Sequence, residues 1–178
     1  MNRYRLAAAV AGLLTVLLLQ ATVIAPVVAP VAVSLPAVLV GAIALVEGPG
    51  SGIAFGFAVG LTADLASDHP AGVLALCWLA VGIACGLLGT GAHSVRRDAA
   101  VVALVAAAAS VVATVVLALT NSAGATVGAA FTQAVPALAG DALLALGVVP
   151  LVRRFLRSDV VRKPAPVPPL LVHGWDRP

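Results

Sequence analysis

Long apolar runs, with the basic residues gathered at certain of their ends, constrain this chain more than any other feature. Of its 178 residues, 62% are hydrophobic and 10% are charged. A soluble domain is about half apolar and about a quarter charged. The hydrophobic core of a 178-residue soluble protein could not bury so many apolar side chains, so the outer ones must be in contact with lipid. We therefore predict an all-α polytopic membrane protein with nearly all its mass inside the bilayer.

Six apolar runs approach or reach the roughly 20 residues that a helix needs to cross a bilayer. Clusters of turn-forming residues separate them, most clearly at 47–50 and 67–70. Residues 153–178 follow the last run; they are basic and then proline-rich, which is typical of a disordered tail. The predicted transmembrane spans are 6–24, 31–46, 51–66, 72–91, 99–119 and 131–152.

The basic residues predict how these spans are oriented. A six-span threading places all ten Lys and Arg on one side, and the three loops on the other side hold none. Short cytoplasmic loops are enriched in Lys and Arg, so we expect both termini in the cytoplasm. The net charge of +3 then reflects membrane flanks that face anionic headgroups, and we expect no nucleic-acid binding. The ten are Arg3, Arg5, Arg96, Arg97, Arg153, Arg154, Arg157, Arg162, Lys163 and Arg177.

The charge rule does not test the turn at 47–50, because this turn contains no Lys or Arg. Runs 31–46 and 51–66 are therefore either two full crossings or a re-entrant hairpin. Their combined length favours two crossings, whereas the short first run, which contains Pro36, keeps the hairpin open. Short spans interrupted by Gly or Pro often mark functional regions of membrane proteins.

Gly52, Gly56, Gly60 and Asp64 recur every four residues and fall close to one stripe of a helix. Glycines at this spacing let another helix approach closely, so the stripe predicts helix packing or a partner contact. An ionised carboxylate is costly in hydrocarbon. Asp64 is accordingly either a polar element of a cavity or partner contact, or an interfacial residue that caps the end of its span.

Three further polar residues within the predicted spans are candidates for a role in the bundle. Asp141 is near the middle of the last run and should be either protonated or hydrogen-bonded within the bundle. Gln20 and Gln133 lie toward the outward ends of the first and last runs, where pairing with another helix is their expected use. The candidate partners of Asp141 are Gln20, Thr15, Ser110, Thr114 and the backbone.

No group of residues indicates catalysis, a metal site or a cofactor. His69 and His93 fall in loops without a matching set of carboxylate and thiol ligands. Cys77 and Cys85 are eight residues apart, which on a helix is roughly 12 Å and too far for a disulfide, so both should be packing residues. The glycines at 48–52 lie between apolar runs with no preceding strand, so they do not form a nucleotide-binding loop. We expect a non-enzymatic protein.

The block Gly56-Phe57-Ala58-Val59-Gly60-Leu61-Thr62-Ala63-Asp64, followed by Gly72-Val73-Leu74-Ala75-Leu76, resembles the core signature of the MreD family of rod shape-determining membrane proteins. Gln20 at the end of the first span, Gln133 in the last span and the basic end after it are similar to the family pattern as well. The resemblance runs from Arg3 to about Arg157 and so covers nearly the whole chain.

The resemblance implies a scaffold of the cell-wall elongation machinery, the elongasome, in the bacterial inner membrane. It also implies a fold like the membrane-embedded substrate-binding subunit of energy-coupling transporters. The implied partners are a single-span MreC-like protein, the glycosyltransferase RodA with its class B penicillin-binding protein, and MreB on the cytoplasmic side. Two positions depart from the family pattern: Ala37 follows Pro36 where Asp is frequent, and Asp141 stands where Asn is frequent.

Two other classes of function stay open. A substrate-binding subunit of a vitamin-type importer would share the fold, but it needs polar and aromatic groups gathered near the outer face. An intramembrane enzyme would need cooperating carboxylates, whereas Asp64 and Asp141 are predicted on different helices at different depths. The residues that could serve an importer are few and scattered: Asp64, Asp68, Trp78, His69, Asn121 and Gln133.

Overall fold

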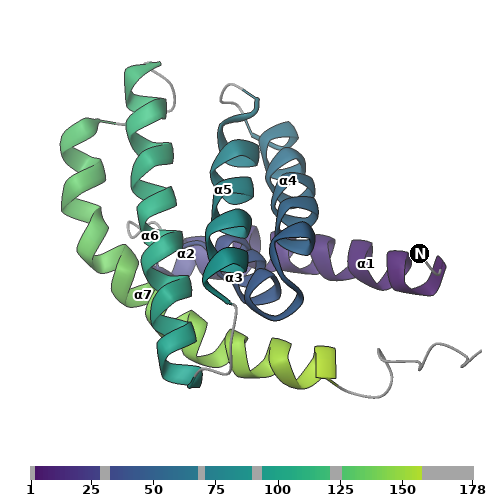
Figure 1. The fold of residues 1–178 in the computed structure, drawn as a ribbon. Helices are drawn as coiled ribbons and strands as arrows, with labels where there is room; N and C mark the ends of the chain where they lie inside the picture. The colour runs from purple at the N-terminus through teal and green to yellow at the C-terminus, as the bar shows by residue number, and fades with distance from the viewer. Residues whose placement is uncertain (1–2, 29–32, 68–70, 90–93, 121–125, 158–178) are drawn as a thin grey trace, which may run out of the picture.

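A computed structural model describes residues 3–28, 33–67, 71–89, 94–120 and 126–157, which fold into six continuous helices and their connections (Figure 1). The first is α1 (Arg3–Leu19), which continues through a π-helical segment, η1 (Gln20–Ile24), into α2 (Ala25–Val28). The others are α3 (Leu35–Glu47), α4 (Pro49–Leu65), α5 (Val73–Leu88), α6 (Val95–Leu119) and α7 (Val127–Arg157).

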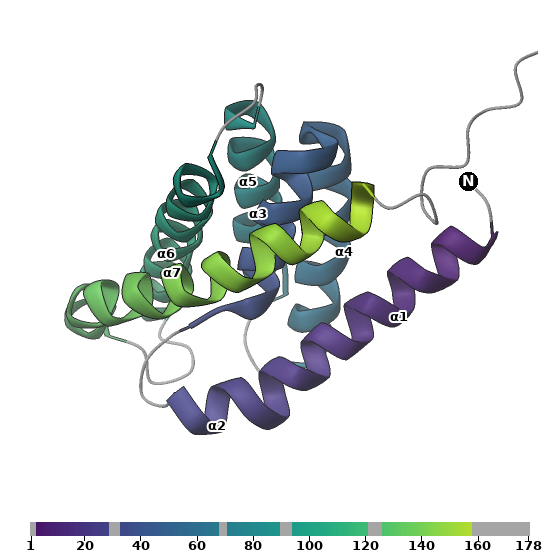
Figure 2. The same ribbon diagram turned by 90° about the horizontal axis from the view of Figure 1, so that it is seen from below.

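Helix α3 lies at the centre of the bundle. It packs against α4, α5, α6 and α7, and it also touches α1 and η1. Its first turn is built by Ser34, whose hydroxyl accepts a hydrogen bond from the Ala37 N–H, and by Pro36, which suits a helix start because it has no N–H to satisfy. Most of α3 is buried, whereas α1 lies along the outside of the bundle (Figure 2). The core is therefore organised around α3.

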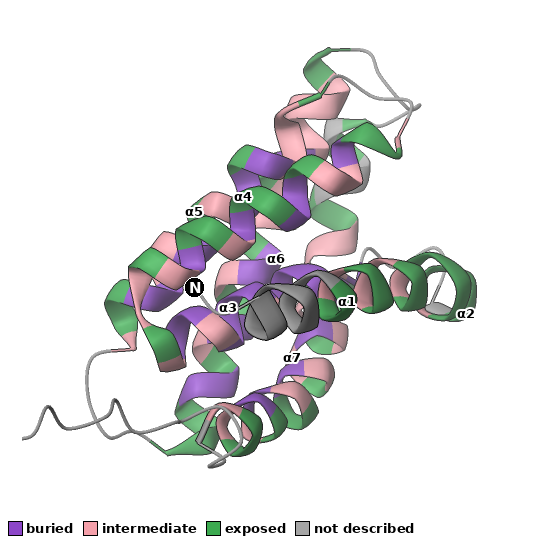
Figure 3. Cartoon of the chain, turned by 90° about the vertical axis from the view of Figure 1, so that its right-hand side faces the viewer, coloured by how far each residue is buried: buried purple, intermediate pink, exposed green. Residues whose placement is uncertain are grey.

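The outer faces of the helices are apolar. Figure 3 shows buried positions on the faces that helices turn toward one another and exposed positions on the outer faces. Large apolar side chains such as Phe57, Leu76 and Leu143 are exposed there, which suits contact with lipid. Two helical segments, Val95–Leu119 and Phe131–Leu156, are long and apolar enough to cross a membrane. Three shorter segments of the described chain, Ala11–Val27, Leu35–Glu47 and Val73–Leu88, are apolar helices too.

Helices α4 and α5 pack antiparallel through glycine. Gly52 lies against the backbone of Gly82, Gly56 against that of Trp78, and Gly60 against that of Ala75. A Cβ atom added at any of these three positions on α4 would overlap the α5 backbone. The stripe that the sequence singled out thus packs against a helix of the same chain.

Several helix ends differ by a few residues from the predicted span ends. The first helix continues past the predicted span end at residue 24, through Pro26, to Val28. The π turn before Pro26, in which the Ala25 N–H bonds to the Gln20 carbonyl, shifts the hydrogen-bond register. Arg96 and Arg97 lie in the first turn of α6 rather than in a loop.

A further difference is at the C-terminal end, where α7 continues through residues 153–157 that were expected in the tail. The rest of that predicted tail, 158–178, lies outside the described residues. Positions 68–70, in the predicted turn at 67–70, and positions 121–125, between the last two predicted spans, lie outside them as well. Helix α7 also bends along its length in Figure 1 and contains Pro136 and Pro150, which interrupt its hydrogen bonding.

We predict that Gly56→Leu lowers the free energy of unfolding by about 3 kcal/mol, because the new side chain forces α4 away from α5. The measurement is thermal unfolding of the purified protein in mild detergent. Ala58→Leu is the matched control, since Ala58 is two residues away on the exposed face of the same helix. Equal stability of the two variants would contradict the close α4–α5 contact.

Candidate functional site

The side chain of Asp64 accepts hydrogen bonds from the start of a neighbouring helix. Asp64 is 2% exposed at the end of α4. Its Oδ2 accepts from the N–H groups of Gly72 (2.9 Å) and Ala75 (2.9 Å), and its Oδ1 accepts from the Leu74 N–H (3.1 Å). These N–H groups belong to the first turn of α5 and have no acceptor within the helix. A carboxylate there also meets the positive end of the helix dipole. Asp64 therefore caps α5 from another helix.

Gln20 and Asp141 converge on the segment that leads into α3. Gln20 Nε2 donates to the Val33 carbonyl (2.9 Å), and the Leu35 N–H donates to Gln20 Oε1 (2.9 Å). Between them, the Ser34 N–H donates to Asp141 Oδ1 (3.0 Å). We call this arrangement of Gln20, Asp141 and residues 33–35 the α3 clasp. It joins the first helix, the start of α3 and the middle of α7.

Two buried oxygen atoms on α7 have no hydrogen-bond partner among the described residues. They are Gln133 Oε1 and Asp141 Oδ2, and the Asp141 residue as a whole is fully buried. Their residues are eight apart, about two helical turns, so both lie toward the interior of the bundle. Of the partners considered for Asp141, the backbone supplies the contact, while Gln20 reaches the same segment without bonding to Asp141.

The pair formed by Asp98 and Arg153 is a site that the sequence did not reveal. Asp98, in the first turn of α6, is 3% exposed and forms an ion pair with Arg153 near the end of α7. The sequence pattern placed Asp98 in a loop and Arg153 in a tail, so neither was considered a bundle residue. One feature of the sequence could have indicated this pair: Asp98 is a single carboxylate that directly follows Arg96 and Arg97 and directly precedes the apolar run 99–119.

Two of the residues that a small-molecule importer would use, Asp64 and Trp78, are buried within the bundle. Asp64 is engaged by the α5 backbone, and Trp78 is 8% exposed in the core. Asp68, His69 and Asn121 lie outside the described residues. Cys77 and Cys85 are buried free thiols, and no three His, Cys, Asp or Glu residues of the described segments gather in a metal-binding arrangement.

Comparison with known proteins gives one match. A family model described as rod shape-determining protein MreD matches residues 4–159. The comparisons with curated proteins and with solved structures found no match.

For the Asp64 cap, we expect Asp64→Leu to lower the free energy of unfolding by about 3 kcal/mol, since three N–H groups would lose their acceptor. Asp64→Asn should cost less, because its remaining oxygen can still accept. Thermal unfolding gives the stability, and hydrogen exchange at the Leu74 and Ala75 amides locates the effect. Unchanged exchange at α5 in Asp64→Leu would refute the assigned cap.

For the α3 clasp, we expect Gln20→Leu and Asp141→Leu each to destabilise the bundle by about 2 kcal/mol. Both side chains hold the same segment, so the double variant should lose less than the sum of the two single losses. Thermal unfolding of all three measures the coupling. Thr15→Val is the control, because the Thr15 hydroxyl bonds only to the Ala11 carbonyl of its own helix (2.8 Å). Strictly additive losses would argue against the shared clasp.

Proposed function

Because this chain belongs to the MreD family of rod shape-determining proteins, we propose that it is a membrane scaffold that regulates cell-wall elongation. The observation that carries the proposal is the family match over residues 4–159, most of the chain. Membership makes this a non-enzymatic membrane protein of cell-shape determination. The proposal extends this assignment to the topology of the protein, its partners and its mode of action.

The proposed topology is six crossings of the bacterial inner membrane with both termini in the cytoplasm. It is supported by the one-sided distribution of the ten Lys and Arg residues and by the apolar outer faces of the described helices. Runs 31–46 and 51–66 then cross separately, and their helices α3 and α4 meet at the turn around Gly48, which has a positive φ of 92°.

The proposed partners are a single-span MreC-like protein and, through it, RodA with its class B penicillin-binding protein. MreB on the cytoplasmic side completes the set. A chain whose described residues are almost all helical has little surface outside the bilayer for such contacts. Association within the bilayer through outer helix faces suits a partner that contributes one transmembrane helix. Through these contacts the protein would modulate peptidoglycan synthesis.

The proposed mode of action is that of a rigid platform. The side chains of Gln20 and Asp64 form hydrogen bonds with the chain's own backbone, and α5 packs against the glycine stripe of α4. Polar groups engaged in internal hydrogen bonds are not available to capture a small molecule. This use of the interior favours a scaffold over the importer subunit that the sequence left open.

The test is affinity isolation of the tagged protein from its native membrane in mild detergent, followed by mass spectrometry. We expect an MreC-like protein and wall-synthesis enzymes to be enriched over a control with an unrelated, equally expressed multi-span protein. Recovery of ATPase subunits with a coupling membrane protein would instead identify an importer subunit and refute the scaffold.

A further inference from the structure

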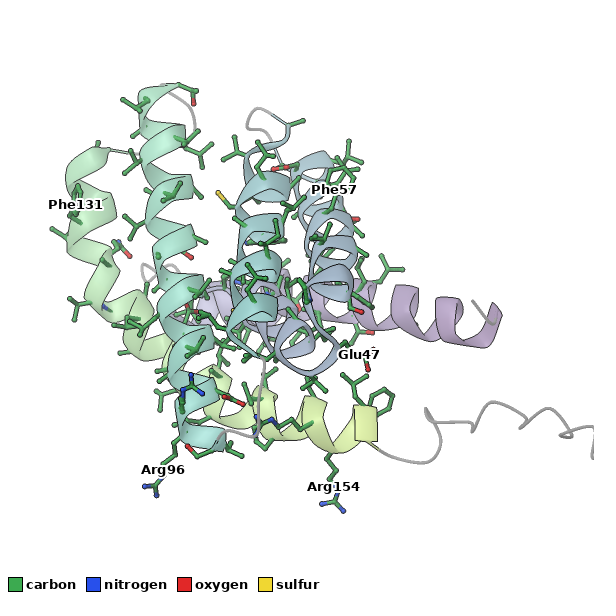
Figure 4. The ribbon with its side chains drawn as sticks, in the orientation of Figure 1. Glu47, Phe57, Arg96, Phe131 and Arg154 are labelled. Carbon is green, nitrogen blue, oxygen red and sulfur yellow. The ribbon has the colours of Figure 1, made fainter. Side chains whose placement is uncertain are left out.

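Three exposed arginines lie at one end of the helix bundle. Arg96 and Arg97 are in the first turn of α6, and Arg154 is near the end of α7. Figure 4 shows the labelled side chains of Arg96 and Arg154 projecting from the same end of the molecule, away from the helices. Segments distant in the sequence thus present their positive charge on a common surface, which we call the arginine end.

The ion pair between Asp98 and Arg153 holds this surface together. It joins the start of α6 to the end of α7, with Asp98 buried and the Arg153 side chain 17% exposed. Because the pair fixes one helix end against the other, the exposed arginines of both helices have a defined relative position. The pair also consumes the carboxylate that lies nearest to Arg96 and Arg97 in the sequence.

The described residues supply little negative charge to balance the arginine end. Of their four carboxylates, Asp64 and Asp141 are buried against backbone N–H groups and Asp98 is paired with Arg153, which leaves Glu47 as the exposed one. Within these same segments, Arg96, Arg97 and Arg154 have no ion-pair partner. Three guanidinium groups therefore face outward with at most one exposed carboxylate of the described chain to oppose them.

Apolar side chains flank the arginines. Val95, Leu151 and Phe155 are exposed by 38%, 67% and 60%, and they neighbour the basic residues along α6 and α7. A row of guanidinium groups beside exposed apolar side chains matches the boundary between lipid headgroups and acyl chains. The planar guanidinium can donate two parallel hydrogen bonds to a phosphate, and the start of α6 adds the positive end of its helix dipole.

From these observations we propose that the arginine end binds the phosphate headgroups of anionic phospholipids such as phosphatidylglycerol. The acyl chains would cover Phe155 and Leu151, while Arg96 and Arg97 on α6 and Arg154 on α7 contact headgroup phosphates. A soluble acidic protein would match the charge but would leave these apolar side chains in water. The inference concerns lipid recognition and does not depend on the proposed elongation partners.

The test is native mass spectrometry of the full-length protein in detergent, titrated with phosphatidylglycerol or with phosphatidylcholine. We expect tighter binding of phosphatidylglycerol, and a loss of this preference by roughly fivefold for each arginine changed to glutamine. The variants are R96Q/R97Q/R154Q and, as the charge-matched control, R96K/R97K/R154K. The lysine variant should retain most of the preference, because it keeps the positive charges.

A second measurement uses the unmodified protein, so it does not depend on the folding of any variant. Thermal unfolding should occur at a higher temperature with phosphatidylglycerol than with phosphatidylcholine, and the difference should shrink as salt is raised.

Three outcomes would overturn the proposal. One is equal binding of the two lipids, and another is an unchanged preference in the glutamine variant. The third is equal stabilisation by inorganic phosphate at the same concentration, which would indicate an anion site without lipid selectivity. A glutamine variant that keeps its lipid but loses a co-purified acidic protein would show that the surface binds protein instead.

Discussion

Backbone N–H groups at the starts of helices are the constraint on which this structure depends. The first N–H groups of a helix have no acceptor within it, and hydrocarbon supplies no water to replace one. At α3 and α6 the preceding serines, Ser34 and Ser94, supply one acceptor each, but other helices supply acceptors as well. Asp64 at the end of α4 serves the first turn of α5, and Gln20 and Asp141 serve the segment that begins α3. The polar residues within the apolar helices therefore complete the hydrogen bonding of the backbone.

Close packing and polar capping are linked through the geometry of α4. Gly52, Gly56, Gly60 and Asp64 share one face, so the antiparallel approach that seats the glycines on α5 also brings the Asp64 carboxylate to its first turn. In lipid the hydrophobic effect does not hold helices together, and close van der Waals contact between small residues takes its place. A shift along the α4–α5 contact would lose the packing and the cap at once, which favours a single register.

Polar side chains of the interior and side chains of the surface have different roles in this non-enzymatic protein. The described polar side chains of its interior mainly position its own helices. We propose that the apolar outer faces and the arginine end are the surfaces that associate with other molecules. In a scaffold of the elongation machinery, the outer faces would serve protein partners within the bilayer and the arginine end would serve the lipid headgroups. The ion pair between Asp98 and Arg153 holds the ends of α6 and α7 together, and these are the two helices that carry the arginine end.

The sequence by itself determined the all-helical class, the approximate positions of the helices and the face that carries the glycines, because apolar runs and four-residue spacing are local properties of the chain. It also carried the family signature around residues 56–64. It did not determine which helix fills the glycine stripe, or that Asp141 reaches Ser34 across 107 positions. Nor did it show that Asp98 and Arg153 lie within helices and pair. Only the tertiary structure decided those contacts. The way the helices pack determines which backbone groups and charges need a partner, and which side chains are near enough to supply it.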